Sequence, residues 1–325
     1  MGTETATAWG LLKLNWILVA VLALVLAVAL AATDFWLKIQ SATMPLAIAA
    51  VYGGMAYRNL ATPRLRDTRV VFTLASTAQL VLIVALLTPL TYVAAAADLP
   101  LQDGHLVMLD RALGLDWPGY VAFFNARPWL FHYLSLGYRM IAWPILGLPV
   151  ILGMTGNYVR LQKFTLAFTV ALIVTTVVSM LVPAEGAFYG HHLAADAFSN
   201  ITPGGYLDQI RDFPAVRDGV LRALDILHLV GIITFPSFHA VSAVLFVWAL
   251  WPVWWMRPFA LISNALMLAG TPIGGGHYFV DVFAGIAVGV LAIAAADAIG
   301  ARLARPVRVP AFLTIRMTPR AVWLE

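Results

Sequence analysis

Long apolar runs, separated by short polar connections, dominate the hydrophobic pattern of this chain. A helix needs about 17 to 25 apolar residues to cross roughly 30 Å of hydrocarbon. Runs that qualify or nearly qualify cover residues 14–32, 42–57, 70–96, 133–153, 164–182, 238–256, 257–273 and 278–298. The pattern therefore predicts an all-α fold, a polytopic transmembrane bundle of about eight spans.

The amino-acid composition also indicates a membrane protein. Of the 325 residues, 62% are hydrophobic and 11% are charged, and the mean hydropathy is +0.87. No polar block is large enough to fold separately, so a single membrane domain is expected. The first run is too long for a signal peptide, which makes it a retained helix. The absence of cysteine excludes disulfides, thiolate metal sites and cysteine nucleophiles.

Positive charge alternates between the two sides of this predicted bundle. Because basic loops stay in the cytoplasm, the alternation predicts that both termini are cytoplasmic. The same bias accounts for the net charge of +4, so no nucleic-acid partner is expected. The basic residues on the cytoplasmic side are Lys13, Arg58, Arg64, Arg66, Arg69, Arg160, Lys163, Arg257, Arg302, Arg305, Arg308, Arg316 and Arg320.

Two long connections, 97–132 and 183–237, fall on the opposite, outer side and carry most of the acidic residues. Loops of this length are usually functional or internally structured. Within the second, Val216 to Leu229 is amphipathic, which predicts a short helix lying at the interface.

Candidate chemistry begins at two helix starts. Pro236 and Ser237 precede the sixth run and form a helix-start signal, so His239 lies in the first turn. His277 and Asp281 open the eighth run and are four residues apart, on one helix face. Asp281 can accept the ring N–H of His277 and leave the other ring nitrogen free as a nucleophile.

The predicted topology brings His239 and His277 to the same outer face. Glycines before His277 allow close approach of a ligand to the backbone, and unpaired amides at the helix start would attract an anion. Ser237, Gly275 and Gly276 are therefore predicted phosphate ligands. The plainer alternatives are a hydrogen-bonded histidine, an ordinary Pro-Ser cap and glycines that serve packing. An ionisable His and Asp pair in a membrane helix favours function, because burying such groups is costly.

At these positions the sequence resembles the type 2 phosphatidic acid phosphatase superfamily. Pro236, Ser237 and His239 match its second signature, whose histidine is the general acid, and His277 with Asp281 matches its third, whose histidine becomes phosphorylated. The H-Y-x-x-D form resembles the branch of inositol phosphorylceramide synthase and the sphingomyelin synthases, and the stretch 110–118 is similar to bacterial relatives of that branch.

The resemblance covers roughly residues 70–298 and implies a six-helix catalytic core there. Residues 1–69 would then be N-terminal transmembrane helices and residues 299–325 a cytoplasmic tail. The expected location is a bacterial inner membrane with the active site on the outer face. The expected partners are the membrane and a phospholipid or lipid-phosphate substrate, with no metal and no cofactor, and the oligomeric state is left open.

Two departures from the family concern its cations. The first signature with its Lys and Arg-Pro is missing, and Thr271 stands where the phosphatase branch has an arginine. Arg139 is the predicted replacement, because arginine inside a membrane segment is costly; alternatively it extends to the interface. His191, His192 and Asp196 are a candidate metal site, but no third well-placed ligand accompanies them in this loop, so no metal site is predicted.

The sequence thus predicts a lipid phosphotransferase that acts through phosphohistidine, with a lipid phosphatase of the same superfamily as the alternative. A transporter that uses Arg139, Glu185, His277 and Asp281 is a rival from another class, although no paired broken helices are visible. A serine protease built on Ser237 is a second rival, with poor geometry.

Overall fold

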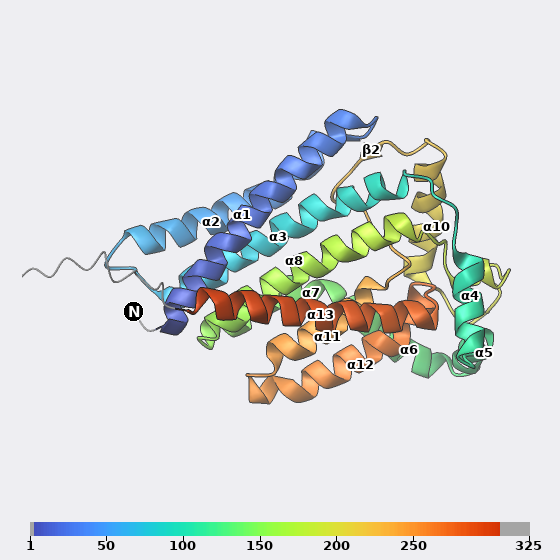
Figure 1. The fold of residues 1–325 in the computed structure, drawn as a ribbon. Helices are drawn as coiled ribbons and strands as arrows, with labels where there is room; N and C mark the ends of the chain where they lie inside the picture. Colours follow the sequence, from blue (N-terminus) through green and yellow to red (C-terminus); the bar gives the residue numbers. More distant parts are fainter. Residues whose placement is uncertain (1–2, 306–325) are drawn as a thin grey trace, which may run out of the picture.

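The computed structural model describes residues 3–305 and shows long helices that run side by side (Figure 1). The predicted all-α bundle is confirmed. Most of the predicted tail over 299–325, with Arg308, Arg316 and Arg320, lies outside the described residues. The elements in chain order are α1 (Thr3–Ala32), β1 (Trp36–Leu37), α2 (Ile39–Ala61), α3 (Thr68–Ala95), α4 (Asp103–Ala112), α5 (Trp117–Asn125), α6 (Pro128–Arg139), η1 (Met140–Ala142), α7 (Trp143–Met154), α8 (Tyr158–Leu181), α9 (Ala187–Gly190), α10 (Gly204–Arg217), β2 (Ala223–Leu224), α11 (Phe238–Leu250), η2 (Trp254–Met256), α12 (Arg257–Gly274) and α13 (Phe279–Leu303).

Each predicted apolar run coincides with helix. The run 133–153 is divided into α6 and α7, because Pro144 lacks the N–H that a continuous helix would need. Within the described residues, five helical segments are long and apolar enough to cross a membrane: α1, α3, the pair α6–α7, α8 and α13. Helix α11 is apolar but shorter. These properties are consistent with a multi-pass integral membrane protein.

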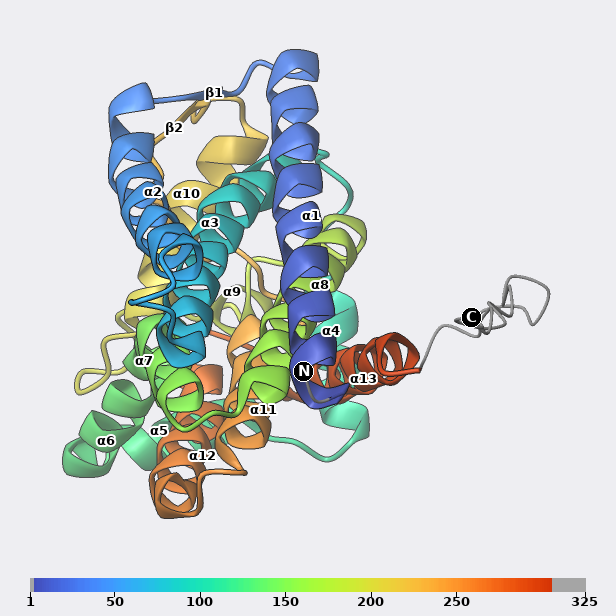
Figure 2. The same ribbon diagram turned by 90° about the vertical axis from the view of Figure 1, so that its left-hand side faces the viewer.

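The bundle has two distinct ends (Figure 1). At one end, here called the terminal end, lie the start of α1 and the end of α13; at the other, the loop end, lie α4, α5 and α10. Seen from the terminal end, α1, α2 and α3 occupy one side of the bundle and α6, α11 and α12 the other, with α8 between them (Figure 2).

A buried polar network joins α1, α3 and α8. The side-chain amide of Asn15 donates to Gln162 Oε1 at 2.9 Å, and Gln162 Nε2 donates to the Ser76 hydroxyl at 2.6 Å. Polar contacts of this kind hold membrane helices together where the surrounding lipid is as apolar as the helix surface. They attach the N-terminal helix α1 to the core.

Small residues bring α11 and α13 close together. A Cβ at Gly285 would overlap the backbone carbonyl of Ser237, and a Cβ at Gly289 would lie 3.1 Å from Val244 Cβ. Glycines four residues apart let helix backbones approach closely in membranes. Because His239 begins α11 and His277 precedes α13, this packing sets the separation of the two histidines.

The long connections are internally structured, but the predicted helix over Val216 to Leu229 is wrong. The helix α10 ends at Arg217, and the chain then enters β2, which pairs in parallel with β1. Arg222 contributes to that pairing, because its carbonyl accepts the amide of Trp36 at 3.1 Å. Long-range backbone pairing therefore replaces local helix formation after α10.

Candidate active site

The structure brings the two predicted histidines together at the loop end. Ser237 caps α11 by accepting the amide of Ala240, which places His239 in the first turn. His277 lies two residues before the first residue of α13 and is 3% exposed. The ring centroids of His239 and His277 are 6.4 Å apart. Two helix starts that lie far apart in sequence thus face each other.

Asp281 lies behind His277, as the four-residue spacing predicts. Its side chain is fully buried, and Oδ2 lies 3.3 Å from His277 Nδ1. The same oxygen accepts the backbone amide of Tyr278 at 2.8 Å, which fixes the carboxylate. When Nδ1 carries the proton and donates to Asp281, Nε2 keeps its lone pair and is the nitrogen available for nucleophilic attack.

A cavity of about 250 Å³ opens between these histidines. His239, His277, Gly275 and Gln209 line it, and most of the remaining wall is apolar and comes from α3, η1, α7, α8 and the segment 229–233. No Lys or Arg is among the described residues that line the cavity. An amphiphilic ligand with a small polar head would fit such a lining better than a multiply charged solute.

Tyr138 is a site residue that the sequence reasoning missed. Its ring stacks on His239 with 3.9 Å between the ring centroids and 11° between the planes, and it lines the cavity. A Cβ at Gly275 would lie 2.8 Å from the Tyr138 hydroxyl and 2.9 Å from His277 Nε2. Only glycine at position 275 leaves room for both groups, which places a hydroxyl donor beside the candidate nucleophile.

The predicted free amides at the start of α13 are not free, and this part of the prediction is wrong. The amides of Phe279 and Val280 donate to the two carboxylate oxygens of Asp110, each at 2.9 Å. Tyr278 donates to Asp281 in the same way. Protein carboxylates therefore occupy the anion-binding end of this helix, and they fix the backbone beside His277.

This geometry can be compared with known proteins. A family model described as PAP2 superfamily matches residues 104–295, more than half of the chain. The chain belongs to the PAP2 superfamily. Membership supports an enzyme that acts as a phosphatase or phosphotransferase on lipid phosphates. A search of curated proteins and a search of solved structures found no match.

The PAP2 region begins within α4, and the structure explains why α4 and α5 belong to the site. The indole of Trp117 donates to the carbonyls of Pro272 and His277, at 3.1 and 3.0 Å. Asp103 accepts the amides of Glu185 and Gly186 and the hydroxyl of Tyr278. These contacts hold the loop that carries the candidate nucleophile, so α4 and α5 are a scaffold for it.

Burial changes the acidity of this scaffold. Desolvation raises the pKa of Asp103, against hydrogen bonds from backbone amides and Tyr278 that oppose the rise. Desolvation likewise raises the pKa of Asp110, opposed by the amides of Phe279 and Val280. For Glu185, burial raises the pKa and the neighbouring charge of Asp103 adds to the rise. The loop end of this PAP2 protein thus holds two buried carboxyl groups, Asp103 and Asp110, and the half-buried Glu185.

The remaining predicted site residues lie elsewhere. Ser237 is buried as a helix cap and makes no hydrogen bond to a histidine within the described chain, which leaves the protease alternative without a base. Gly276 has φ +63° and its carbonyl accepts Ala187 N at 2.6 Å, outside the cavity lining. Arg139 is exposed and does not line the cavity. Among the predicted phosphate ligands, the structure brings Gly275 to the histidines.

The histidines of the second long loop do not form a metal site in the described part of the chain. His191 stacks on Trp117 with 5.4 Å between ring centroids, while His192 and Asp196 are exposed. No three His, Asp or Glu side chains between residues 3 and 305 come together as a metal-binding group.

Proposed function

We propose that this PAP2 protein is a lipid phosphotransferase that moves a phosphate-bearing head group from a lipid donor to an alcohol acceptor through a phosphohistidine at His277. The observation that carries the proposal is the placement of His239 and His277 across one cavity, with ring centroids 6.4 Å apart. Nucleophilic attack needs roughly 3 Å between reacting atoms, and proton transfer needs a hydrogen bond of roughly 3 Å. A phosphoryl group between the two rings satisfies both.

The reaction then has two steps. First, His277 Nε2 attacks phosphorus, the bond from phosphorus to the donor lipid's alkoxide oxygen breaks, and protonated His239 gives its proton to that oxygen. In the second step, His239 removes the proton from the acceptor alcohol, whose oxygen attacks phosphorus and breaks the bond to His277. Asp281 keeps Nδ1–H oriented and stabilises positive charge on His277. Tyr138 and Gly275 are proposed phosphate contacts.

Several features favour transfer over hydrolysis. The cavity wall is mostly apolar, and Gln209 from α10 and the segment 229–233 cover it at the loop end. Such a site holds little water, and the outcome depends on whether water or an alcohol reaches the phosphohistidine first. The H-Y-x-x-D form at His277 also resembles the phosphotransferase branch. We place the site at the outer face of a bacterial inner membrane because the basic loops lie at the other end.

Phosphoenzyme trapping tests the nucleophile. Purified protein is mixed with a phospholipid whose phosphate is radiolabelled and is then denatured in base, which preserves phosphohistidine. Wild type and His132→Ala, a control in which an exposed histidine on α6 is removed, should retain label; His277→Ala should retain none. His239→Ala should label slowly because the leaving oxygen lacks its acid. Label in His277→Ala equal to wild type would rule out this nucleophile.

A second arm separates transfer from hydrolysis. The same protein receives a phospholipid donor with and without diacylglycerol, ceramide or inositol, and mass spectrometry follows the products. A transferred head group that requires the acceptor is the expected result. Release of free phosphate that no alcohol changes, with no transferred lipid, would replace the transferase by a lipid phosphatase.

A further inference from the structure

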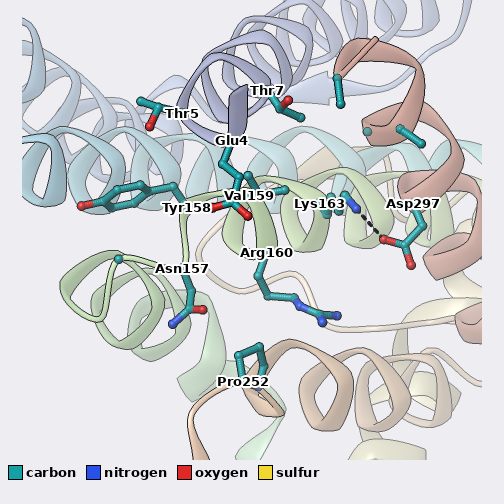
Figure 3. Close-up of a pocket in the computed structure, with 14 residues that line it drawn as sticks. Glu4, Thr5, Thr7, Asn157, Tyr158, Val159, Arg160, Lys163, Pro252 and Asp297 are labelled. Atoms are coloured by element: carbon teal, nitrogen blue, oxygen red, sulfur yellow. Dashed lines mark hydrogen bonds and ion pairs between the residues drawn. The ribbon is translucent and has the colours of Figure 1, made fainter. Parts of the chain in front are cut away.

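A second polar cavity lies at the terminal end of the bundle (Figure 3). Its volume is about 520 Å³, and its walls come from the start of α1, the start of α8, the end of α13 and Pro252 between α11 and α12. Asp281 and Asp297 lie roughly 24 Å apart along α13 at about 1.5 Å per residue. Because Asp297 lines this cavity, the cavity is separate from the histidine site and independent of the proposed reaction.

Four charged side chains line this polar cavity, and two of them form a salt bridge with each other. Lys163 Nζ donates to Asp297 Oδ1 at 2.8 Å (Figure 3). The other two, Glu4 and Arg160, form no hydrogen bond and no ion pair with another described residue. The cavity therefore offers one unpaired anion and one unpaired cation to a ligand.

Arg160 is held in place although no carboxylate binds it. Its guanidinium carbon lies 4.2 Å from the centre of the Trp248 ring, so a cation–π contact fixes the side chain over α11. A guanidinium has five N–H donors in a planar fork that matches the oxygens of a phosphate. With these donors unused by the protein, the site is ready for an anionic oxygen cluster.

An apolar groove continues from the same arginine. This second hollow of about 550 Å³ is lined by Arg160, by Asn264 and otherwise by apolar side chains, most of them from α11, α12 and α13, among them Trp248, Leu268 and Ile293. Arg160 thus stands at the junction of a polar cavity and an apolar groove. A free phosphate would use only the first hollow, whereas a phospholipid places its head in one and an acyl chain in the other.

We propose that this pair of hollows, at the end opposite the histidines, binds an amine-bearing zwitterionic phospholipid. The lipid phosphate meets Arg160, the ammonium group meets Glu4, and one acyl chain occupies the groove beside Trp248. Phosphate alone would leave Glu4 uncompensated and repelled, which is why the ligand carries a positive group as well. The bound lipid would contact the helices α8, α11 and α13.

Native mass spectrometry of the full chain in detergent tests this site. The probes are phosphatidylethanolamine, phosphatidylglycerol, glycerophosphoethanolamine and inorganic phosphate. Wild type should bind one phosphatidylethanolamine in preference to the other three. Arg160→Gln should weaken that binding by at least about tenfold, as expected for loss of charge-assisted hydrogen bonds, and Glu4→Gln should reduce the preference over phosphatidylglycerol.

Arg58→Gln is the matched control, since Arg58 is an exposed arginine in the last turn of α2 and lines neither the polar cavity nor the apolar groove. This variant should bind lipid like wild type. Equal lipid binding by Arg160→Gln and wild type overturns the proposal, as does glycerophosphoethanolamine or inorganic phosphate binding as tightly as the lipid. If Arg160→Gln does not fold, Glu4→Gln still tests the proposal, because Glu4 is exposed and its replacement should not affect folding. An unchanged lipid preference in Glu4→Gln contradicts the proposal.

Discussion

Replacing Asp110 by Asn tests whether α4 positions the loop that carries the candidate nucleophile His277. Asp110 in α4 accepts the amides of Phe279 and Val280, each at 2.9 Å. Asn keeps the shape but turns an N–H₂ group toward one of these amides. A hydrogen bond to a charged group contributes about 1.5 to 3 kcal/mol, and a buried donor left unpaired costs about 1 to 3 kcal/mol. Asp110→Asn should therefore destabilise the protein by about 2 kcal/mol.

The effect on activity should exceed the effect on stability. His277 lies two residues before the first of the two amides that Asp110 holds, so a shift of the α13 start changes the distance from His277 to His239. A displacement of about 1 Å costs on the order of 100-fold in rate. We expect kcat/KM to fall by about that factor in protein that is still folded.

Asp116→Asn is the matched control for this prediction. Asp116 caps its own helix α5 by accepting the amide of Gly119 at 3.0 Å in an exposed position. Asn is as good a cap as Asp, so Tm and kcat/KM should stay at the wild-type values. Both quantities would be measured in detergent, by thermal unfolding and by lipid turnover. Wild-type kcat/KM in Asp110→Asn would refute the scaffold role of α4.

Three further predictions concern packing, pH and orientation. Gly285→Ala should lower activity in expression-matched membranes by at least about tenfold, because its Cβ would overlap the Ser237 carbonyl and push α11 from α13, whereas Gly289→Ala should cost less. Burial raises the pKa of Asp103, so its contribution to stability is present below the ordinary Asp pKa of about 4 and is lost as pH rises through the raised value; Asp103→Asn should remove this decline of Tm above about pH 4. A tag near Asp196 should be accessible from outside the cell and a reporter fused after residue 325 should be cytoplasmic, and the reverse labelling contradicts this orientation.

The sequence was sufficient to predict the helices that the long apolar runs form, and also the His277–Asp281 pair, for local reasons. Apolar runs of membrane length form helices whatever their neighbours, and a four-residue spacing fixes a shared helix face. The cap on α13 could not be predicted in the same way, because Asp110 is separated from Phe279 by 169 residues. From the sequence alone, the first amides of α13 have no visible acceptor. The acceptor is the Asp110 carboxylate, which the packing of α4 brings to them.

Tyr138 and Arg139 show a second limit. Charge draws attention to Arg139, yet successive helix residues point about 100° apart. Tyr138 faces His239 and the cavity, while Arg139 is exposed. The choice between two neighbours depends on the rotation of α6 about its axis, which its packing on α12 determines: a Cβ at Gly270 would overlap the carbonyl of Leu134. The sequence carries no local signal for that rotation.

The charge balance of the cavity connects the missing family cations with the proposed chemistry. No Lys or Arg is among the described residues of the lining, so an incoming phosphate meets Tyr138, Gly275 and the two histidines. In the proposed mechanism, His239 protonated in the presence of the bound phosphate would be both the acid for the leaving oxygen and the positive charge nearest the phosphate. Once it has given up its proton, the cavity holds a phosphohistidine and a neutral imidazole. Water and an alcohol are both neutral nucleophiles, so charge does not choose between them; the mostly apolar wall of the cavity would favour an alcohol that enters from the lipid phase, which is the proposed transfer.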